Sequence, residues 1–164
     1  MFHVVLVEPE IPQNAGNIAR TCAATGCTLH LVRPLGFEIS DKYLKRAGLD
    51  YWHLVDVRVH EDLAAFLAEY PAARMHLFTT KARRTYAEAA YREGDFLVFG
   101  KETRGLEEEF LLQHAEECVR IPMREEARSL NLSNSVAIAV YEGLRQNAFG
   151  SLARAGELHR LHWQ

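Results

Sequence analysis

The stretch RSLNLSNSVAIAV, residues 128–140, joins a polar segment directly to an apolar one. Its first part holds five serine and asparagine side chains, and its last five residues are apolar. Ser133 or Asn134 would be a good N-cap, so we predict a helix over 133–147 whose first N–H groups are open to a ligand. Capping uses one or two of the five polar side chains. The others indicate a binding surface.

The apolar part of this helix predicts burial on every side. Val136, Val140 and Leu144 form one stripe, and Ala137 and Tyr141 begin another. In a chain of 164 residues, such burial favours a partner subunit, most simply a two-fold homodimer. A central helix in a monomer would explain the same pattern.

Upstream of this stretch, short β-branched runs alternate with longer helical ones. Strands are predicted at 2–7, 28–32, 52–59, 75–80, 96–100 and 118–122. Helices are predicted at 13–25, 41–47, 61–69, 86–92, 107–114 and 133–147. The alternation indicates an α/β fold with a mainly parallel sheet flanked by helices. We expect one domain over 1–150 and a C-terminal tail over 151–164.

Composition and charge narrow the function. The net charge of -3 argues against a non-specific nucleic-acid binder and against DNA, so any RNA contact must be local. The candidate basic spots are Lys42, Lys45, Arg46, Lys81, Arg83, Arg84, Arg120, Arg124 and Arg128. Three cysteines without a CxxC pair indicate reduced thiols. No basic leader and no apolar run of ~18 residues are present, which favours the cytoplasm and no membrane.

Common nucleotide and metal motifs are missing. EPEIPQNAGN, residues 8–17, has one glycine where a dinucleotide fold needs GxGxxG. The run 94–101 differs from a P-loop in its spacing, and Glu102 follows where Ser or Thr should bind magnesium. His159 and His162 have no completing ligands. We therefore expect no metal.

Two further stretches carry candidate chemistry. NAGNIAR, residues 14–20, opens the first helix with asparagines and ends at Arg20, although a lone arginine at such a position is more often a solvated helix charge. FGKETRGL, residues 99–106, brackets Glu102 between Gly100 and Gly105 after a buried strand. Ligands of open α/β sheets bind at such strand ends, although a plain turn would also use glycine.

Taken in order, NAGNIAR, FGKETRGL and the run from IPM to RSLNLSNSVAIAVYE resemble the three motifs of the SPOUT class of RNA methyltransferases, and within it the TrmL proteins. The resemblance covers roughly 1–146. It implies a C-terminal trefoil knot, an obligate homodimer and S-adenosylmethionine as methyl donor. It also implies methylation of the ribose 2′-hydroxyl of the tRNA wobble nucleotide, cytidine or modified uridine.

The resemblance also assigns site residues. Cofactor contacts would fall on Phe78, Thr79, Gly100, Glu102, Gly105, Ile121, Met123, Ser129 and Leu130. Catalytic or substrate-binding roles would fall on Asn14, Arg20, Glu102, Ser129 and Asn131. Because a guanidinium stays protonated, we expect Arg20 to orient the ribose or phosphate and stabilise alkoxide charge, reaching the cofactor of the other subunit.

Two alternatives remain open at this stage. The chain could methylate another tRNA or an rRNA site, or it could be an RNA-binding dimer without turnover. Intact Arg20, Glu102, Ser129 and Asn131 argue against the second.

Overall fold

The computed structural model describes residues 1–39 and 52–163. All six strands of its sheet are parallel, in the order β3-β2-β1-β5-β4-β6. The strands are β1 (His3–Val7), β2 (Thr28–Val32), β3 (Val57–His60), β4 (Met75–Phe78), β5 (Phe96–Phe99) and β6 (Cys118–Val119). The predicted α/β class is confirmed. The trefoil knot stays a prediction.

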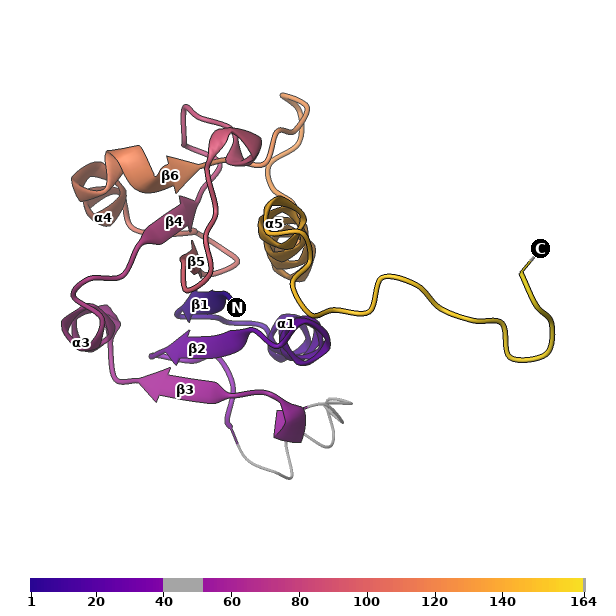
Figure 1. Cartoon of the computed structure of the whole chain (residues 1–164). Coiled ribbons are helices and arrows are strands. Elements are labelled where there is room, and N and C mark those ends of the chain that lie inside the picture. The colour runs from indigo at the N-terminus through magenta and orange to yellow at the C-terminus, as the bar shows by residue number, and fades with distance from the viewer. Residues whose placement is uncertain (40–51, 164) are drawn as a thin grey trace.

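Helices cover both faces of this sheet (Figure 1). The α-helices are α1 (Pro12–Thr25), α3 (Leu63–Glu69), α4 (Glu108–Gln113) and α5 (Leu132–Gln146), and the 3-10 turns are η1 (Trp52–Leu54), η2 (Tyr86–Glu88) and η3 (Ala115–Glu117). One apolar core lies between the sheet and the α1 and α5 pair, and a second lies beneath α3 and α4. Strands buried on both faces need the near-continuous apolar runs found in β1, β4 and β5.

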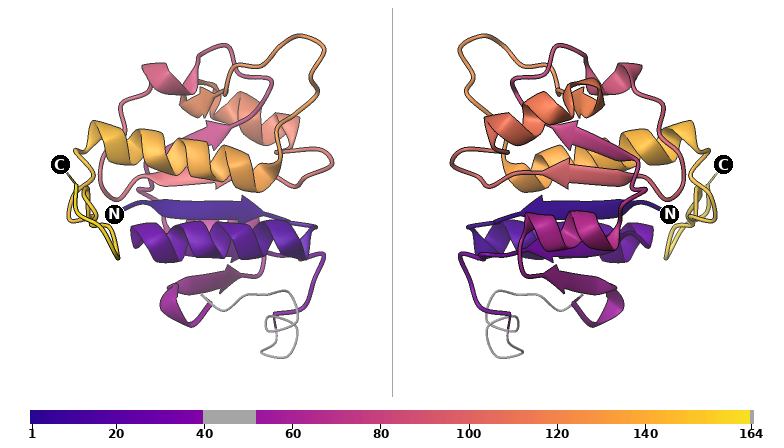
Figure 2. Two further views of the ribbon diagram at one scale, coloured as in Figure 1. Left: turned by 90° about the vertical axis from the view of Figure 1, so that its right-hand side faces the viewer. Right: turned by 90° about the vertical axis from the view of Figure 1, so that its left-hand side faces the viewer.

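The sheet order brings the candidate motifs together. From β1 the chain proceeds outward to β2 and β3, whereas β5, β4 and β6 lie on the other side of β1. Loops leaving β1 and β5 therefore diverge at a topological switch point, where α/β proteins bind ligands. Figure 2 shows the starts of α1 and α5 at the same end of the sheet as the arrowheads of the strands.

Two of the predicted strands were wrong in part. The strand predicted over 52–59 begins as the 3-10 turn η1, and only Val57–His60 pairs with β2. Strand β6 has two residues instead of five. The helix predicted over 41–47 lies outside the described residues.

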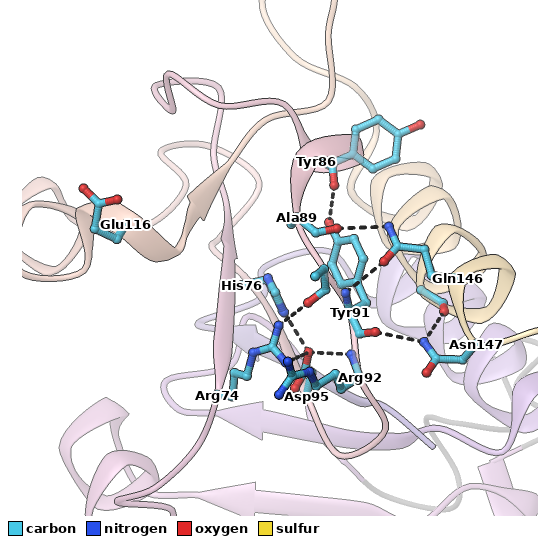
Figure 3. A network of polar contacts seen from close by, with 12 residues as sticks. Arg74, His76, Tyr86, Ala89, Tyr91, Arg92, Asp95, Glu116, Gln146 and Asn147 are labelled. Carbon is cyan, nitrogen blue, oxygen red and sulfur yellow. Dashed lines mark hydrogen bonds and ion pairs between the residues drawn. The ribbon is translucent and has the colours of Figure 1, made fainter.

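The helix predicted over 86–92 is a single 3-10 turn, η2. The backbone after η2 is held by Gln146, the last residue of α5, and by Asn147, which follows it (Figure 3). Gln146 accepts from the Tyr91 N–H at 3.0 Å and donates to the Ala89 carbonyl at 3.0 Å. Asn147 donates to the Tyr91 carbonyl at 3.0 Å. These tertiary hydrogen bonds already pair the backbone N–H of Tyr91 and the carbonyls of Ala89 and Tyr91, so a longer helix would add little stabilisation.

The C-terminal part beyond α5 has no helix or strand over 151–163 and runs away from the domain (Figure 1). Among the described residues, no helix is both long and apolar enough to span a membrane.

Candidate active site

A pocket of ≈ 500 Å³ lies at the carboxyl ends of β1, β4, β5 and β6, beside the start of α5. Each of the three motif stretches contributes to its wall. Its lining residues are Ile11, Asn14, Phe78, Thr79, Thr80, Lys81, Phe99, Gly100, Lys101, Glu102, Thr103, Arg104, Gly105, Ile121, Met123, Arg128, Ser129, Leu130, Asn131, Leu132 and Ser135. Pockets of this volume suit small molecules and cofactors.

The loop after β5 is folded tightly on itself. Gly105 donates its N–H to the Lys101 carbonyl at 2.8 Å and has φ +71°, a conformation that favours glycine. A Cβ on Gly100 would lie 2.1 Å from the Gly105 carbonyl carbon and 2.2 Å from the Leu106 nitrogen. A side chain at position 100 would therefore clash with the backbone of Gly105 and Leu106, and glycine is needed there for the close approach of two backbone segments as well as for a turn.

Glu102 is fixed by three donors. One carboxylate oxygen accepts from the Glu10 N–H at 2.7 Å, and the other accepts from the Ile11 N–H at 3.0 Å and the Asn14 side-chain N–H at 3.1 Å. Helix α1 has no acidic residue in its first turn, and its N-cap Ile11 has no capping side chain. Glu102 supplies the missing negative charge from a distant loop.

Asn131 connects the first helix to the last. Its side-chain N–H donates to the Asn14 carbonyl oxygen at 3.0 Å. Its own oxygen accepts from the Ser133 N–H at 2.9 Å, the Ser133 hydroxyl at 2.6 Å and the Asn134 N–H at 3.4 Å. Asn131 is thus the N-cap of α5, and the prediction of Ser133 or Asn134 was wrong. The N-cap lies two residues earlier because the helix starts at Leu132.

Further polar contacts tie the loop after β1 to the loop after β5. The Lys101 ammonium lies 2.6 Å from the Glu8 carboxylate, which raises the pKa of Lys101. The Thr103 N–H and hydroxyl each donate to Glu10 at 3.1 Å. The pocket wall is therefore held by side chains separated by about ninety residues in sequence.

All nine residues expected to contact the cofactor line this pocket. Asn14, Glu102, Ser129 and Asn131 of the five expected catalytic residues line it too. Arg20 does not; it is exposed on α1, six residues beyond Asn14. The individual roles of these residues stay predictions.

Sequence reasoning missed several parts of the site. Ser133 was predicted as a cap or as one of five polar side chains of a binding surface, and nothing in its spacing marks it as a partner of Asn131. Lys101 and Thr103 lie inside the glycine-bracketed loop, where the position alone could have suggested them.

The basic residues divide into several groups. Arg104 and Arg128 are exposed at the pocket lining. Lys81 also lines the pocket but pairs with Glu108 at 3.1 Å, and Arg84 donates to the Glu116 carbonyl at 2.8 Å. The predicted basic spot at Lys42, Lys45 and Arg46 lies outside the described residues. Within 1–39 and 52–163, no group of three His, Cys, Asp or Glu side chains could hold a metal ion.

Comparison with known proteins agrees with this geometry. The chain is 53% identical over 150 residues to the tRNA (cytidine(34)-2′-O)-methyltransferase of Methylovorus glucosotrophus, covering 91% of this chain and 97% of that one. A structure solved to study the 2-OH methylation of C/U34 on tRNA has 53% identity and a TM-score of 0.84, covering 90% of this chain and 97% of the other.

More distant structures share the fold. An AdoMet-bound rRNA methyltransferase from Sinorhizobium meliloti is 24% identical with a TM-score of 0.74, over 88% of this chain and 56% of that one. The model of the SpoU rRNA Methylase family matches residues 1–141. This match spans the first two motifs, the third motif except its last residue, and every strand of the described residues, and the chain belongs to the SpoU rRNA methylase family.

Proposed function

We propose that this protein transfers a methyl group from S-adenosylmethionine to the ribose 2′-hydroxyl of the wobble nucleotide, position 34, in tRNA. The observation that carries the proposal is the meeting of three separated motif loops in one pocket, in a chain 53% identical to a tRNA (cytidine(34)-2′-O)-methyltransferase. The cytoplasm, where reduced cysteines persist, is the compartment that we propose.

The pocket fits S-adenosylmethionine by its chemistry. Phe78, Phe99, Ile121 and Leu130 give an apolar part suited to an adenine ring, and the loop around Gly100 offers backbone groups. When bound, the donor supplies an electrophilic methyl on a sulfonium. The pocket would hold this methyl in line with the ribose oxygen, and such alignment supplies much of the rate.

Negative charge develops on the ribose oxygen as its proton passes to water and the methyl bonds to it, with a neutral thioether as the leaving group. A guanidinium cannot accept that proton, but it can stabilise the resulting alkoxide. We assign this role to Arg20. Because Arg20 does not line the pocket of its own protomer, we propose that it serves the pocket of a second subunit.

A two-fold homodimer would place α5 in the interface. In a single chain α5 buries Val136, Val140 and Leu144 against the sheet, whereas Tyr141 remains 48% exposed and Ile138 is half-buried. The predicted burial on every side is therefore incomplete within one protomer, which supports a covering partner.

The test is methyl incorporation into RNA. Purified protein is incubated with labelled S-adenosylmethionine and tRNA that lacks methylation at position 34, and the label is located by nuclease digestion and mass spectrometry. We expect a 2′-O-methyl group at position 34 only. Label at another tRNA position or in rRNA would identify a different target, and no label in any RNA would indicate an RNA-binding protein without turnover. Arg20→Ala, assayed in parallel, reports whether the label depends on the assigned residue.

A further inference from the structure

A continuous path of hydrogen bonds crosses the pocket from the start of α1 to the start of α5. It runs from the Glu10 and Ile11 N–H groups to Glu102, then to Asn14, to Asn131 and to the first N–H groups of α5. Asn14 is 5% exposed. The path joins the three motif loops, and both asparagines line the pocket.

Chemistry fixes the direction of every bond on this path. Backbone N–H groups only donate, so the side-chain atom of Asn131 that faces Ser133 and Asn134 must be its oxygen. Its NH₂ group therefore faces Asn14, which must present its own oxygen in return. The NH₂ group of Asn14 is then directed to Glu102, a carboxylate that can only accept.

This direction limits what the pocket can offer a ligand. Each asparagine uses its carbonyl oxygen and one N–H within the path, which leaves one N–H on each amide. Glu102 already accepts three of the about four hydrogen bonds open to a carboxylate, so taking up a proton as a general base would weaken the charge-assisted contacts that hold α1. The path therefore leaves one N–H on Asn14 and one on Asn131 to donate, while the Asn131 oxygen already accepts three hydrogen bonds and the Asn14 oxygen accepts from Asn131.

We propose that Glu102 and Ser133 are positioning residues that lock Asn14 and Asn131 as a pair of N–H donors for the negative charge developing on the ribose 2′-oxygen. The inference rests on the function proposed above. Ser133 matters because it is buried, at 9% exposure, and its hydroxyl donates to the Asn131 oxygen at 2.6 Å, which is shorter than any bond on the path. It opposes the rotation of the Asn131 amide that would turn an oxygen toward Asn14.

The decisive variant is Asn131→Asp, because it separates capping from donation. Aspartate caps a helix as well as asparagine, so α5 keeps its bonds from Ser133 and Asn134. A carboxylate cannot donate to Asn14 or to a ligand. The matched control is Asn134→Asp, which adds the same charge at an exposed position three residues on, outside the pocket lining.

We expect Asn131→Asp to slow single-turnover methylation by about 100-fold or more, as loss of an oxyanion donor does. Its dissociation constant for S-adenosylmethionine should stay within a few-fold of the wild-type value, and Asn134→Asp should match the wild type in both. A normal methylation rate in Asn131→Asp would overturn the proposal.

Ser133→Ala provides a neutral second test if Asn131→Asp fails to fold or to bind the donor. Losing one hydrogen bond to Asn131 should slow methylation by roughly tenfold at unchanged S-adenosylmethionine affinity. The side-chain amide signals of ¹⁵N-labelled asparagine should show one slowly exchanging proton on Asn14 and on Asn131, and Ser133→Ala should accelerate exchange at Asn131. If Ser133→Ala changes neither the methylation rate nor the amide exchange at Asn131, the proposal that Ser133 fixes the Asn131 amide is refuted.

These outcomes can be told apart from failure of the proposed function. A wild-type protein that methylates no RNA would reject that function, whereas the amide exchange would still report whether the lock exists.

Discussion

Acid should destabilise this protein through one histidine buried in the sheet. His3, His30 and His60 lie on the adjacent strands β1, β2 and β3 and form a hydrogen-bonded row, with nitrogen separations of 2.9 Å and 3.0 Å. The row ends at Glu69, 3.1 Å from His60. His30 is fully buried and is surrounded by the rings of Phe66, Tyr70 and Phe96.

Burial lowers the pKa of His30 from 6.5 to about 3, helped by the nearby His3, His60 and Arg58 and opposed by Asp56. The unfolded chain therefore binds a proton at a pH where the folded chain does not. The contribution of neutral His30 to the unfolding free energy is fully present above pH 6.5 and is lost progressively as pH falls toward about 3. One pKa unit corresponds to about 1.36 kcal/mol, so His30 alone should cost about 2 kcal/mol of unfolding free energy at pH 5.

Urea unfolding, followed by circular dichroism at pH 8 and pH 5, measures this loss. The side chain introduced by His30→Gln stays neutral and can still donate and accept hydrogen bonds. The drop in unfolding free energy between pH 8 and pH 5 should therefore be smaller in this variant than in the wild type by about 2 kcal/mol. His159→Gln removes an exposed histidine of the tail and should behave as the wild type. Equal losses in the wild type and His30→Gln would refute the reasoning.

Three more perturbations test the site and the core. Gly100→Ala places a Cβ 2.1 Å from backbone across the loop, so it should lower the unfolding free energy by about 1–3 kcal/mol and weaken S-adenosylmethionine binding in calorimetry. Gly156→Ala, with nothing within 4 Å, is its control. Arg20→Ala should abolish methylation while S-adenosylmethionine affinity stays within a few-fold; a parallel loss of binding would contradict its role. Gly143→Ala brings a Cβ to 2.7 Å from the buried Phe2 ring and should also cost about 1–3 kcal/mol in urea unfolding, and unchanged stability would argue against the tight contact.

Local patterns were enough to predict most of the elements. The apolar runs of β1, β2, β4 and β5 identify buried parallel strands, because such strands need apolar side chains on both faces. Pro12 at the first turn of α1 and Gly26 after its end bound a helix for local steric reasons. Two of the motif stretches, 14–20 and 99–106, could likewise be placed after strands from the sequence.

Contacts between distant residues decided the remainder. The segment 86–92 has helical periodicity, yet only η2 forms, because Gln146 and Asn147 satisfy the backbone that a helix would have used. The N-cap of α5 falls on Asn131, whose amide also bonds to Asn14. Capping preferences depend on neighbouring residues only, so they cannot predict the hydrogen bond from Asn131 to the distant Asn14.

The sequence by itself therefore determined the class of the fold, the limits of most elements and the residue types available for chemistry, since periodicity, capping and turn preferences act over a few neighbours. Only the tertiary structure decided the strand order β3-β2-β1-β5-β4-β6 and the bonds that join Asn14, Glu102 and Asn131. Those bonds link side chains up to 117 positions apart, so they exist only once the sheet has brought the strand ends together.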